Sequence, residues 1–131
     1  MANLPYPDGT FVVITTGREA KTFRVAGGAL EQDSHWAPKD LIDDGPAGKI
    51  PPDMSAGEID EATFSKQVAE RLYAMAHKGA FDGLILVADP GTLGEIRPLL
   101  HQEVSSRILL EQAKTLINSP TEDIERSLAS G

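Results

Sequence analysis

Short apolar segments open the chain in a pattern that is typical of neighbouring strands. Residues 10–15 are β-branched or aromatic, which predicts a strand buried on both faces. After a turn at 16–18, residues 19–25 alternate in character and predict an antiparallel strand with one solvated face. Gly27 and Gly28 interrupt that alternation as a bulge or turn. A third short strand is expected around residues 34–36.

An amphipathic helix is predicted in the middle of the chain. Its apolar stripe repeats at spacings of four, four and three and consists of Phe64, Val68, Leu72 and Met75. Ser55 and Glu58 have the spacing of a capping box, so we expect the helix to begin there. Lys78 and Gly79 form a C-terminal stop signal.

A continuous apolar run, 84–88, then predicts a central parallel strand covered on both faces. Asp89 ends this strand, and Thr92 with Glu95 forms a second capping box that predicts the next helix. Pro98 comes early enough to start a fresh helical turn.

The last third of the chain gives two conflicting signals. Helix propensity favours helix throughout 98–117, whereas topology favours a strand at 108–110, because the chain usually returns to the sheet after a helix. We predict the strand. Residues 119–122 combine an N-cap serine, a proline at N1 and a glutamate at N3, which predicts a terminal helix.

This order of elements predicts an α/β fold with a mixed sheet. An N-terminal antiparallel hairpin precedes parallel central strands, helices cover the faces, and the layout is ribonuclease-H-like. We expect residues 1–131 to form a single domain. Residues 37–62 hold four prolines, three glycines, seven acids and two lysines, and that composition predicts a flexible acidic loop.

The overall charge and composition narrow the function classes. The formal net charge is −8, so autonomous binding to nucleic acid or to a membrane surface is disfavoured. There are no cysteines, which excludes disulfides and thiolate metal sites. Neither a signal peptide nor an apolar run of roughly 20 residues is present. We therefore expect a cytoplasmic protein.

A candidate ligand site follows the strand at 84–88. In α/β sheets, ligands tend to bind where a strand's carboxyl end meets a helix N-terminus, and free N–H groups there suit an anion. The side chains and glycines in question are Asp89, Gly91, Thr92 and Gly94, with Thr16 and Gly17 at the end of the first strand. The competing reading, which we favour, is that Thr92 and Glu95 already satisfy those N–H groups as a helix cap.

Catalytic constellations are not evident. A metal-dependent nuclease needs several carboxylates converging on divalent cations, but Thr16 is the expected neighbour of Asp89, and Asp82 should lie at the opposite edge. The three histidines have no metal-ligand spacing, and no serine lies in a Gly-x-Ser-x-Gly elbow. We assign no catalytic residue, metal or cofactor.

Residues 81–100 resemble the signature segment of the bacterial host-attachment protein family, whose members carry a run close to F-D-x-L-x-L-V-A-P-P-x-T-L-G-x-L-R. The resemblance covers most of 10–26 and 64–128 and implies a fold similar to the middle domain of translation release factors. Two polar positions depart from the family pattern. Residues 15–17 are Thr-Thr-Gly instead of Ala-Asp-Gly, and residues 115–117 are Thr-Leu-Ile instead of Asp-Leu-Thr.

The resemblance and the missing constellations together favour a non-catalytic binding module. Its protein partner is unknown, and a homodimer is compatible with the sequence. One alternative is a metal-dependent hydrolase of phosphate esters or RNA that uses Asp89. The other is a ribosome-associated, release-factor-like protein without the Gly-Gly-Gln motif on which peptidyl-tRNA hydrolysis relies.

Overall fold

The computed structural model describes residues 4–37 and 61–130. In this part of the chain, five strands form one mixed sheet in the order β3-β2-β1-β4-β5. The strands are β1 (Phe11–Thr15), β2 (Ala20–Ala26), β3 (Ala29–Trp36), β4 (Leu84–Ala88) and β5 (Ile108–Ala113). The first three pair antiparallel, whereas β1 pairs with β4 and β4 with β5 in parallel. The mixed α/β sheet with an N-terminal hairpin is therefore confirmed, while its ribonuclease-H-like assignment stays a prediction.

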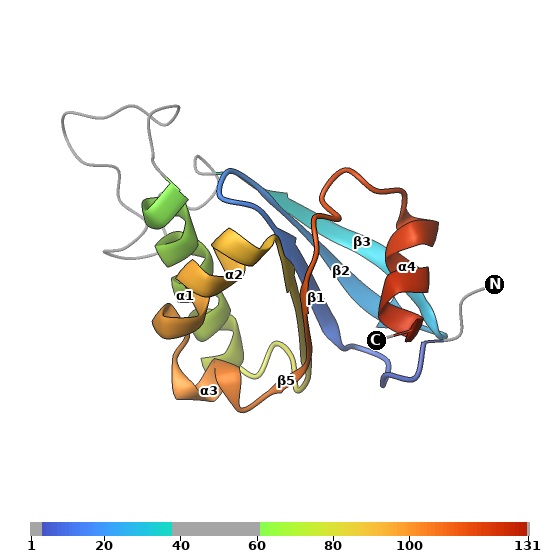
Figure 1. Cartoon of the computed structure of the whole chain (residues 1–131). Coiled ribbons are helices and arrows are strands. Elements are labelled where there is room, and N and C mark those ends of the chain that lie inside the picture. The colour runs from blue at the N-terminus through green and yellow to red at the C-terminus, as the bar shows by residue number, and fades with distance from the viewer. Residues whose placement is uncertain (1–3, 38–60, 131) are drawn as a thin grey trace.

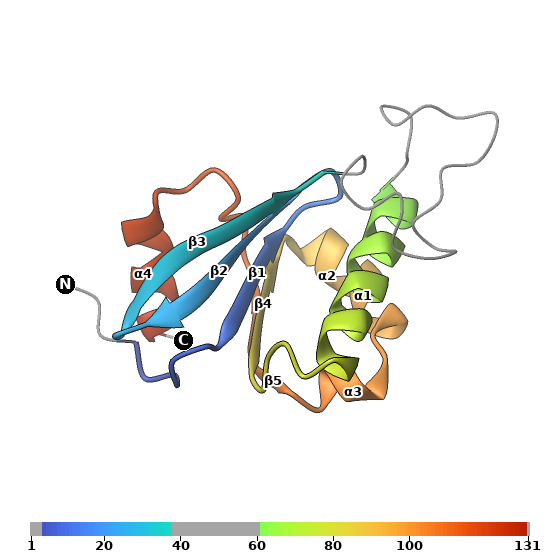
Figure 2. The same cartoon turned by 180° about the vertical axis from the view of Figure 1, so that it is seen from behind.

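Helices cover both faces of the sheet (Figures 1 and 2). They are α1 (Glu61–His77), α2 (Pro90–Ile96), the 3₁₀ turn η4 (Arg97–Leu99), α3 (Gln102–Ser105) and α4 (Thr121–Ser130). One face packs against α1, α2 and α3, and the other packs against α4. None of the described helices is both long and apolar enough to cross a bilayer.

The two central strands, β1 and β4, supply both halves of the core. Phe11, Val13, Leu84 and Leu86 lie in the cluster with α1, and the residues between them, such as Val12 and Ile85, lie in the cluster with α4. Every residue of both strands is buried. Because side chains alternate across a strand, burial on both faces requires an unbroken apolar run, and this is why 84–88 predicted a central strand correctly.

The hairpin between β2 and β3 turns at Gly27 and Gly28, as predicted. Their φ angles are +61° and +80°, the left-handed pair that a two-residue type I′ turn requires. β3 is longer than expected. Its residues from Glu31 to Ser34 are exposed or half-exposed, so they lack the alternation by which a strand is predicted. In β2, a register shift between Thr22 and Phe23 buries both residues, so the predicted simple alternation of that strand was only partly right.

The end of α1 follows the predicted stop signal. Gly79 has a φ of +74°, and its N–H donates to the Ala76 carbonyl at 3.0 Å, while Ala80 N–H donates to the Met75 carbonyl at 2.8 Å. This closes the helix as a Schellman-type cap. The predicted helix start at Ser55, and nearly all of the 37–62 loop, lie outside the described residues.

Three predicted boundaries need correction. α2 begins at Pro90, two residues before the predicted capping residue Thr92. β5 runs to Ala113 instead of ending at 110. α4 begins at Thr121, one residue after the proline that was predicted to open it. The strand assignment itself at 108–110 is confirmed, which means that topology outweighed helix propensity there.

Candidate functional site

The carboxyl ends of β1 and β4 lie side by side. Thr15 is opposite Ala88 in the parallel register, so Thr16 and Asp89 leave the sheet at the same edge. From β1 the chain proceeds to β2 on one side, and from β4 it proceeds to β5 on the other. In open α/β sheets this reversal of direction is where a ligand crevice forms. The sequence therefore predicted correctly that the ends of these two strands are adjacent; that a ligand binds there stays a prediction.

Asp89 is the N-cap of α2. Its Oδ2 accepts the Thr92 backbone N–H at 3.1 Å, and its carbonyl accepts the Leu93 N–H at 2.9 Å. Pro90, at N1, has no N–H to satisfy. The positive end of the short helix thus already faces the chain's own carboxylate, which disfavours a second anion there.

The prediction that a side chain caps the start of α2 was therefore correct, but the predicted capping residues were wrong. We expected Thr92 and Glu95 to close the start of α2, but Asp89 does so. Thr92 contributes its backbone N–H, and its side chain is buried, with 7% of the residue exposed. Glu95 lies one turn further along, where its Oε1 is buried and makes no hydrogen bond to any described residue.

The other predicted residues serve local turns or open surface. Thr16 Oγ1 accepts the backbone N–H groups of Arg18 and Glu19 at 3.2 and 3.3 Å, closing the turn that contains the buried Gly17. A Cβ at Gly91 would meet only Asp89 Oδ2, at 3.5 Å, and one at Gly94 would meet nothing within 4 Å. Within the described residues, no hydrogen bond links the Thr16 turn to α2. A ligand role for these six residues stays a prediction.

The donor set for a metal-dependent hydrolase is not assembled in the described part of the chain. No three histidine, aspartate or glutamate side chains in residues 4–37 and 61–130 are placed to hold one ion. Asp82 precedes β4, at the opposite edge from Asp89, as expected. Asp89 itself is used as a cap.

One side-chain cluster was missed by sequence reasoning. The Tyr73 ring lies 4.3 Å from the His101 ring and 5.8 Å from the His77 ring, centroid to centroid. His77 Nδ1 lies 3.3 Å from Glu103 Oε1, and His101 Nδ1 accepts the Glu103 N–H and so caps α3. The i, i+4 spacing of Tyr73 and His77 signals a shared helix face, but nothing in the sequence brings His101 to it.

Two hollows are lined by none of the six predicted residues. One, of about 340 Å³, lies at the amino ends of β1 and β4. The other, of about 430 Å³, lies between α1 and β3, where the Arg71 guanidinium covers Trp36 at 5.2 Å from the ring centroid. Trp36 is only 4% exposed and packs against Phe11, so it is a core residue.

Comparison with known proteins gives a matching family and several similar solved structures. A structure described as "Archaeal protein" is 16% identical with a TM-score of 0.48, and the match covers 92% of this chain but 36% of that one. This chain therefore spans about a third of that protein's length. No curated protein matches the sequence.

The family comparison covers nearly the whole folded region. The sequence model of bacterial archaeo-eukaryotic release factor family 12 matches residues 9–128, from just before β1 into α4. This match supports the release-factor-like part of the predicted resemblance and not host attachment specifically. The chain belongs to bacterial archaeo-eukaryotic release factor family 12.

Proposed function

We propose that this chain is a ribosome-associated, release-factor-like protein that does not itself hydrolyse peptidyl-tRNA. The observation that carries the proposal is the family match over residues 9–128. It favours the alternative that the sequence left open over the non-catalytic host-attachment reading. The ribosome is the partner that a release-factor-like domain is expected to meet, and the fold itself does not fix that function.

The Gly-Gly-Gln motif on which peptide release relies does not occur in the sequence. The only Gly-Gly pair is Gly27-Gly28, and Ala29 follows it. Both glycines form the tight turn between β2 and β3. Gln32, the next glutamine, is paired with Phe23 inside the sheet. This hairpin therefore offers no glutamine at an exposed loop tip.

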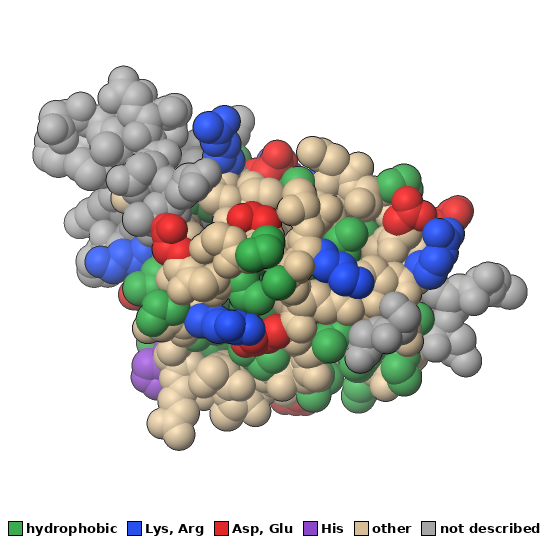
Figure 3. Space-filling model, viewed as in Figure 1, with side chains coloured by type: hydrophobic (Ala, Val, Ile, Leu, Met, Phe, Trp, Pro, Cys, Tyr) green, Lys and Arg blue, Asp and Glu red, His purple; other side chains and the backbone are tan. Residues whose placement is uncertain are grey.

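The charge distribution favours a contact that depends little on phosphates. On the face seen in Figure 3, Lys and Arg side chains are interspersed with Asp and Glu side chains. Several cations are already engaged within the chain. Arg97 pairs with Glu111 and Arg126 with Asp123, and Lys114 donates to Ser127. A protein that neutralises few phosphates loses little affinity as salt rises.

Sucrose-gradient sedimentation with purified ribosomes tests the proposal. We expect the protein to co-migrate with ribosomes or one subunit at low salt, and to lose less than about tenfold in affinity when salt is raised fourfold. Leu86→Asp, which buries a carboxylate in the core and unfolds the sheet, is the control for non-specific adhesion. Failure to co-migrate at low salt, or equal co-migration of the unfolded variant, contradicts the proposal. Peptidyl-tRNA added to the same complexes should remain intact.

The host-attachment resemblance is better explained by packing. The residues of 81–100 that carry it include the buried strand β4 and the buried Phe81, Leu93 and Ile96. Asp89, Pro90 and Gly91 in the same segment form the start of α2. Because these residues form the core and the helix cap of this chain, they support a common architecture and are not specific evidence for host attachment.

A further inference from the structure

The 340 Å³ hollow lies at the amino ends of the parallel strands, at the end of the sheet opposite to Asp89. Its walls come from the segment before β1, from β2, from the connection between α1 and β4, and from β5. Figures 1 and 2 show both connecting segments along the lower edge of the sheet. Its volume is in the range of small-ligand pockets. None of the six residues predicted as a site lines it.

A fixed guanidinium is the central feature of this hollow. Arg24 lies over the Phe11 ring at 4.6 Å from the centroid. Its Nη1 donates to the carbonyls of Gly9 and Ala80 at 3.0 and 2.9 Å. These contacts use one nitrogen, and neither Nε nor Nη2 has a hydrogen-bond partner among the described residues. The free Nε–Nη2 edge is the fork that binds a carboxylate in bidentate fashion. Because the side chain is already ordered, a ligand would not have to immobilise it.

The charges around Arg24 indicate that a ligand of this hollow carries more than a negative charge. Asp8 and Asp82 also line the hollow, so two carboxylates and one guanidinium share its lining and a simple anion is disfavoured. Asp8 Oδ1 already accepts the Gly27 N–H at 3.0 Å, whereas Asp82 is exposed and has no hydrogen-bond partner in the described part of the chain. A ligand that carries both a carboxylate and a cationic group matches this arrangement.

An apolar wall completes the hollow. Leu109 is 50% exposed, although it is a large apolar residue in a strand. Its side chain lies over Gly83, where a Cβ would come within 2.7 Å of Leu109 Cδ1. The absence of a side chain at position 83 thus allows Leu109 to lie at the rim of the hollow.

We propose that this hollow binds the zwitterion of an apolar α-amino acid. The ligand carboxylate binds Arg24, its ammonium group faces Asp82, and its side chain contacts Leu109. The inference does not depend on ribosome association, because the site is built from residues of this chain alone.

Titration with L-leucine, followed by NMR of the backbone amides, tests the proposal. We expect millimolar L-leucine to shift the resonances of Gly9, Ala80 and Gly83 and to leave those of α4 unchanged. N-acetyl-L-leucine lacks the ammonium group and L-leucinamide lacks the carboxylate. Each should bind at least about tenfold more weakly, the loss expected for one charge-assisted contact. Absence of shifts with L-leucine, or equal binding of the three compounds, would overturn the proposal.

Variants separate the three contacts from effects on folding. Asp82→Asn should weaken L-leucine binding without weakening that of N-acetyl-L-leucine. Leu109→Ala should weaken binding by about threefold to tenfold. Leu99→Ala removes another exposed leucine, outside the hollow, and should leave binding unchanged. Arg24→Lys keeps the charge but removes the fork, and its amide spectrum shows whether the fold is retained. Equal effects of the Leu99 and Leu109 substitutions would contradict the assignment.

Discussion

At the residue scale, the Asp89 carboxylate stabilises α2 by two linked effects. It accepts the Thr92 N–H at 3.1 Å, and it places a negative charge at the positive end of the helix dipole. We expect Asp89→Ala to lower the free energy of unfolding by about 1 kcal/mol, the usual cost of losing an N-cap. Urea denaturation monitored by circular dichroism measures the loss.

Asp89→Asn is the matched control, because asparagine caps helices about as well as aspartate. It should retain most of the stability while removing the charge that a metal-dependent mechanism would require. If the asparagine variant is destabilised as strongly as the alanine variant, the cap does not explain why Asp89 is at this position.

Two glycines with opposite backbone requirements give a second residue-scale prediction. Gly79 has a φ of +74°, so Gly79→Ala should cost about 1 kcal/mol in strain. Gly94 lies inside α2 with open space around it, so Gly94→Ala should raise the free energy of unfolding by about 0.5–1 kcal/mol. Thermal denaturation of both variants checks the signs. A destabilised Gly94→Ala variant would show that the glycine is needed for a reason the packing does not reveal.

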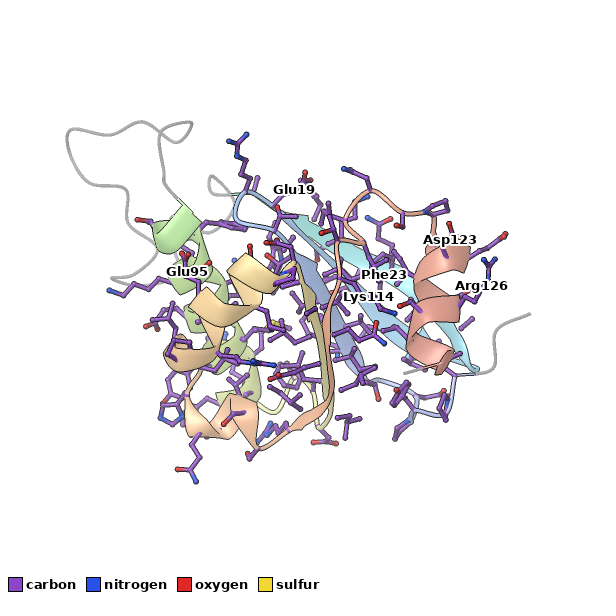
Figure 4. The ribbon with its side chains drawn as sticks, in the orientation of Figure 1. Glu19, Phe23, Glu95, Lys114, Asp123 and Arg126 are labelled. Atoms are coloured by element: carbon purple, nitrogen blue, oxygen red, sulfur yellow. The ribbon has the colours of Figure 1, made fainter. Side chains whose placement is uncertain are left out.

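At the element scale, hydrogen bonds from a buried side chain connect β5 to α4. Gln112 is 8% exposed. Its Nε2 donates to the Ser127 carbonyl at 3.0 Å, and Ser127 Oγ donates to Gln112 Oε1 at 2.9 Å. Nearby, Lys114 reaches the same serine from the exposed surface, and Asp123 and Arg126 extend from α4 (Figure 4).

We expect Gln112→Ala to lower the free energy of unfolding by about 1–2 kcal/mol, because two partly buried hydrogen bonds between β5 and α4 are lost. Lys114→Ala, which removes an exposed contact to the same hydroxyl, should cost less than about 0.5 kcal/mol. Urea titrations of the two variants measure these losses, provided that the m-value stays unchanged. Similar losses for both variants would mean that burial of Gln112 does not determine its contribution.

The elements themselves were largely predictable, and the exceptions have physical causes. The run at 84–88 specified a central strand because both of its faces are buried. Edge strands carry no such signal. β3 has four consecutive exposed or half-exposed polar residues, 31–34, which concealed its length. In β5, the apolar residue Leu109 is exposed. Apolar character therefore did not predict which residues of that strand are buried.

The candidate sites were less predictable than the strands. The sequence located the Asp89 edge because topology alone brings the ends of β1 and β4 together. It could not show that Asp89, and not Thr92, caps α2, because both spacings are compatible with a helix start. The hollow around Arg24 was missed, since it joins β2 to the connection between α1 and β4. Such contacts between segments distant in sequence leave no local pattern.

At the scale of the whole molecule, the two halves of the core cannot form independently. β1 and β4 alternate their side chains between the α1 cluster and the α4 cluster. Phe23, on β2, belongs to the cluster with α4 and lies between the sheet and that helix (Figure 4). Loss of either helical layer would expose one face of the same two strands. We therefore expect the folded region to unfold as one cooperative unit.

The single tryptophan allows this cooperativity to be measured across the sheet. Trp36 belongs to the α1 cluster, whereas Leu128 is fully buried in the α4 cluster on the opposite face. Leu128→Ala should lower the free energy of unfolding by about 2–5 kcal/mol, because it leaves a cavity under α4. If the layers are coupled through β1 and β4, Trp36 fluorescence and far-ultraviolet circular dichroism will show the same lowered midpoint. A fluorescence midpoint that stays at the wild-type value, while the dichroism signal splits into two transitions, would mean that the α4 layer unfolds separately.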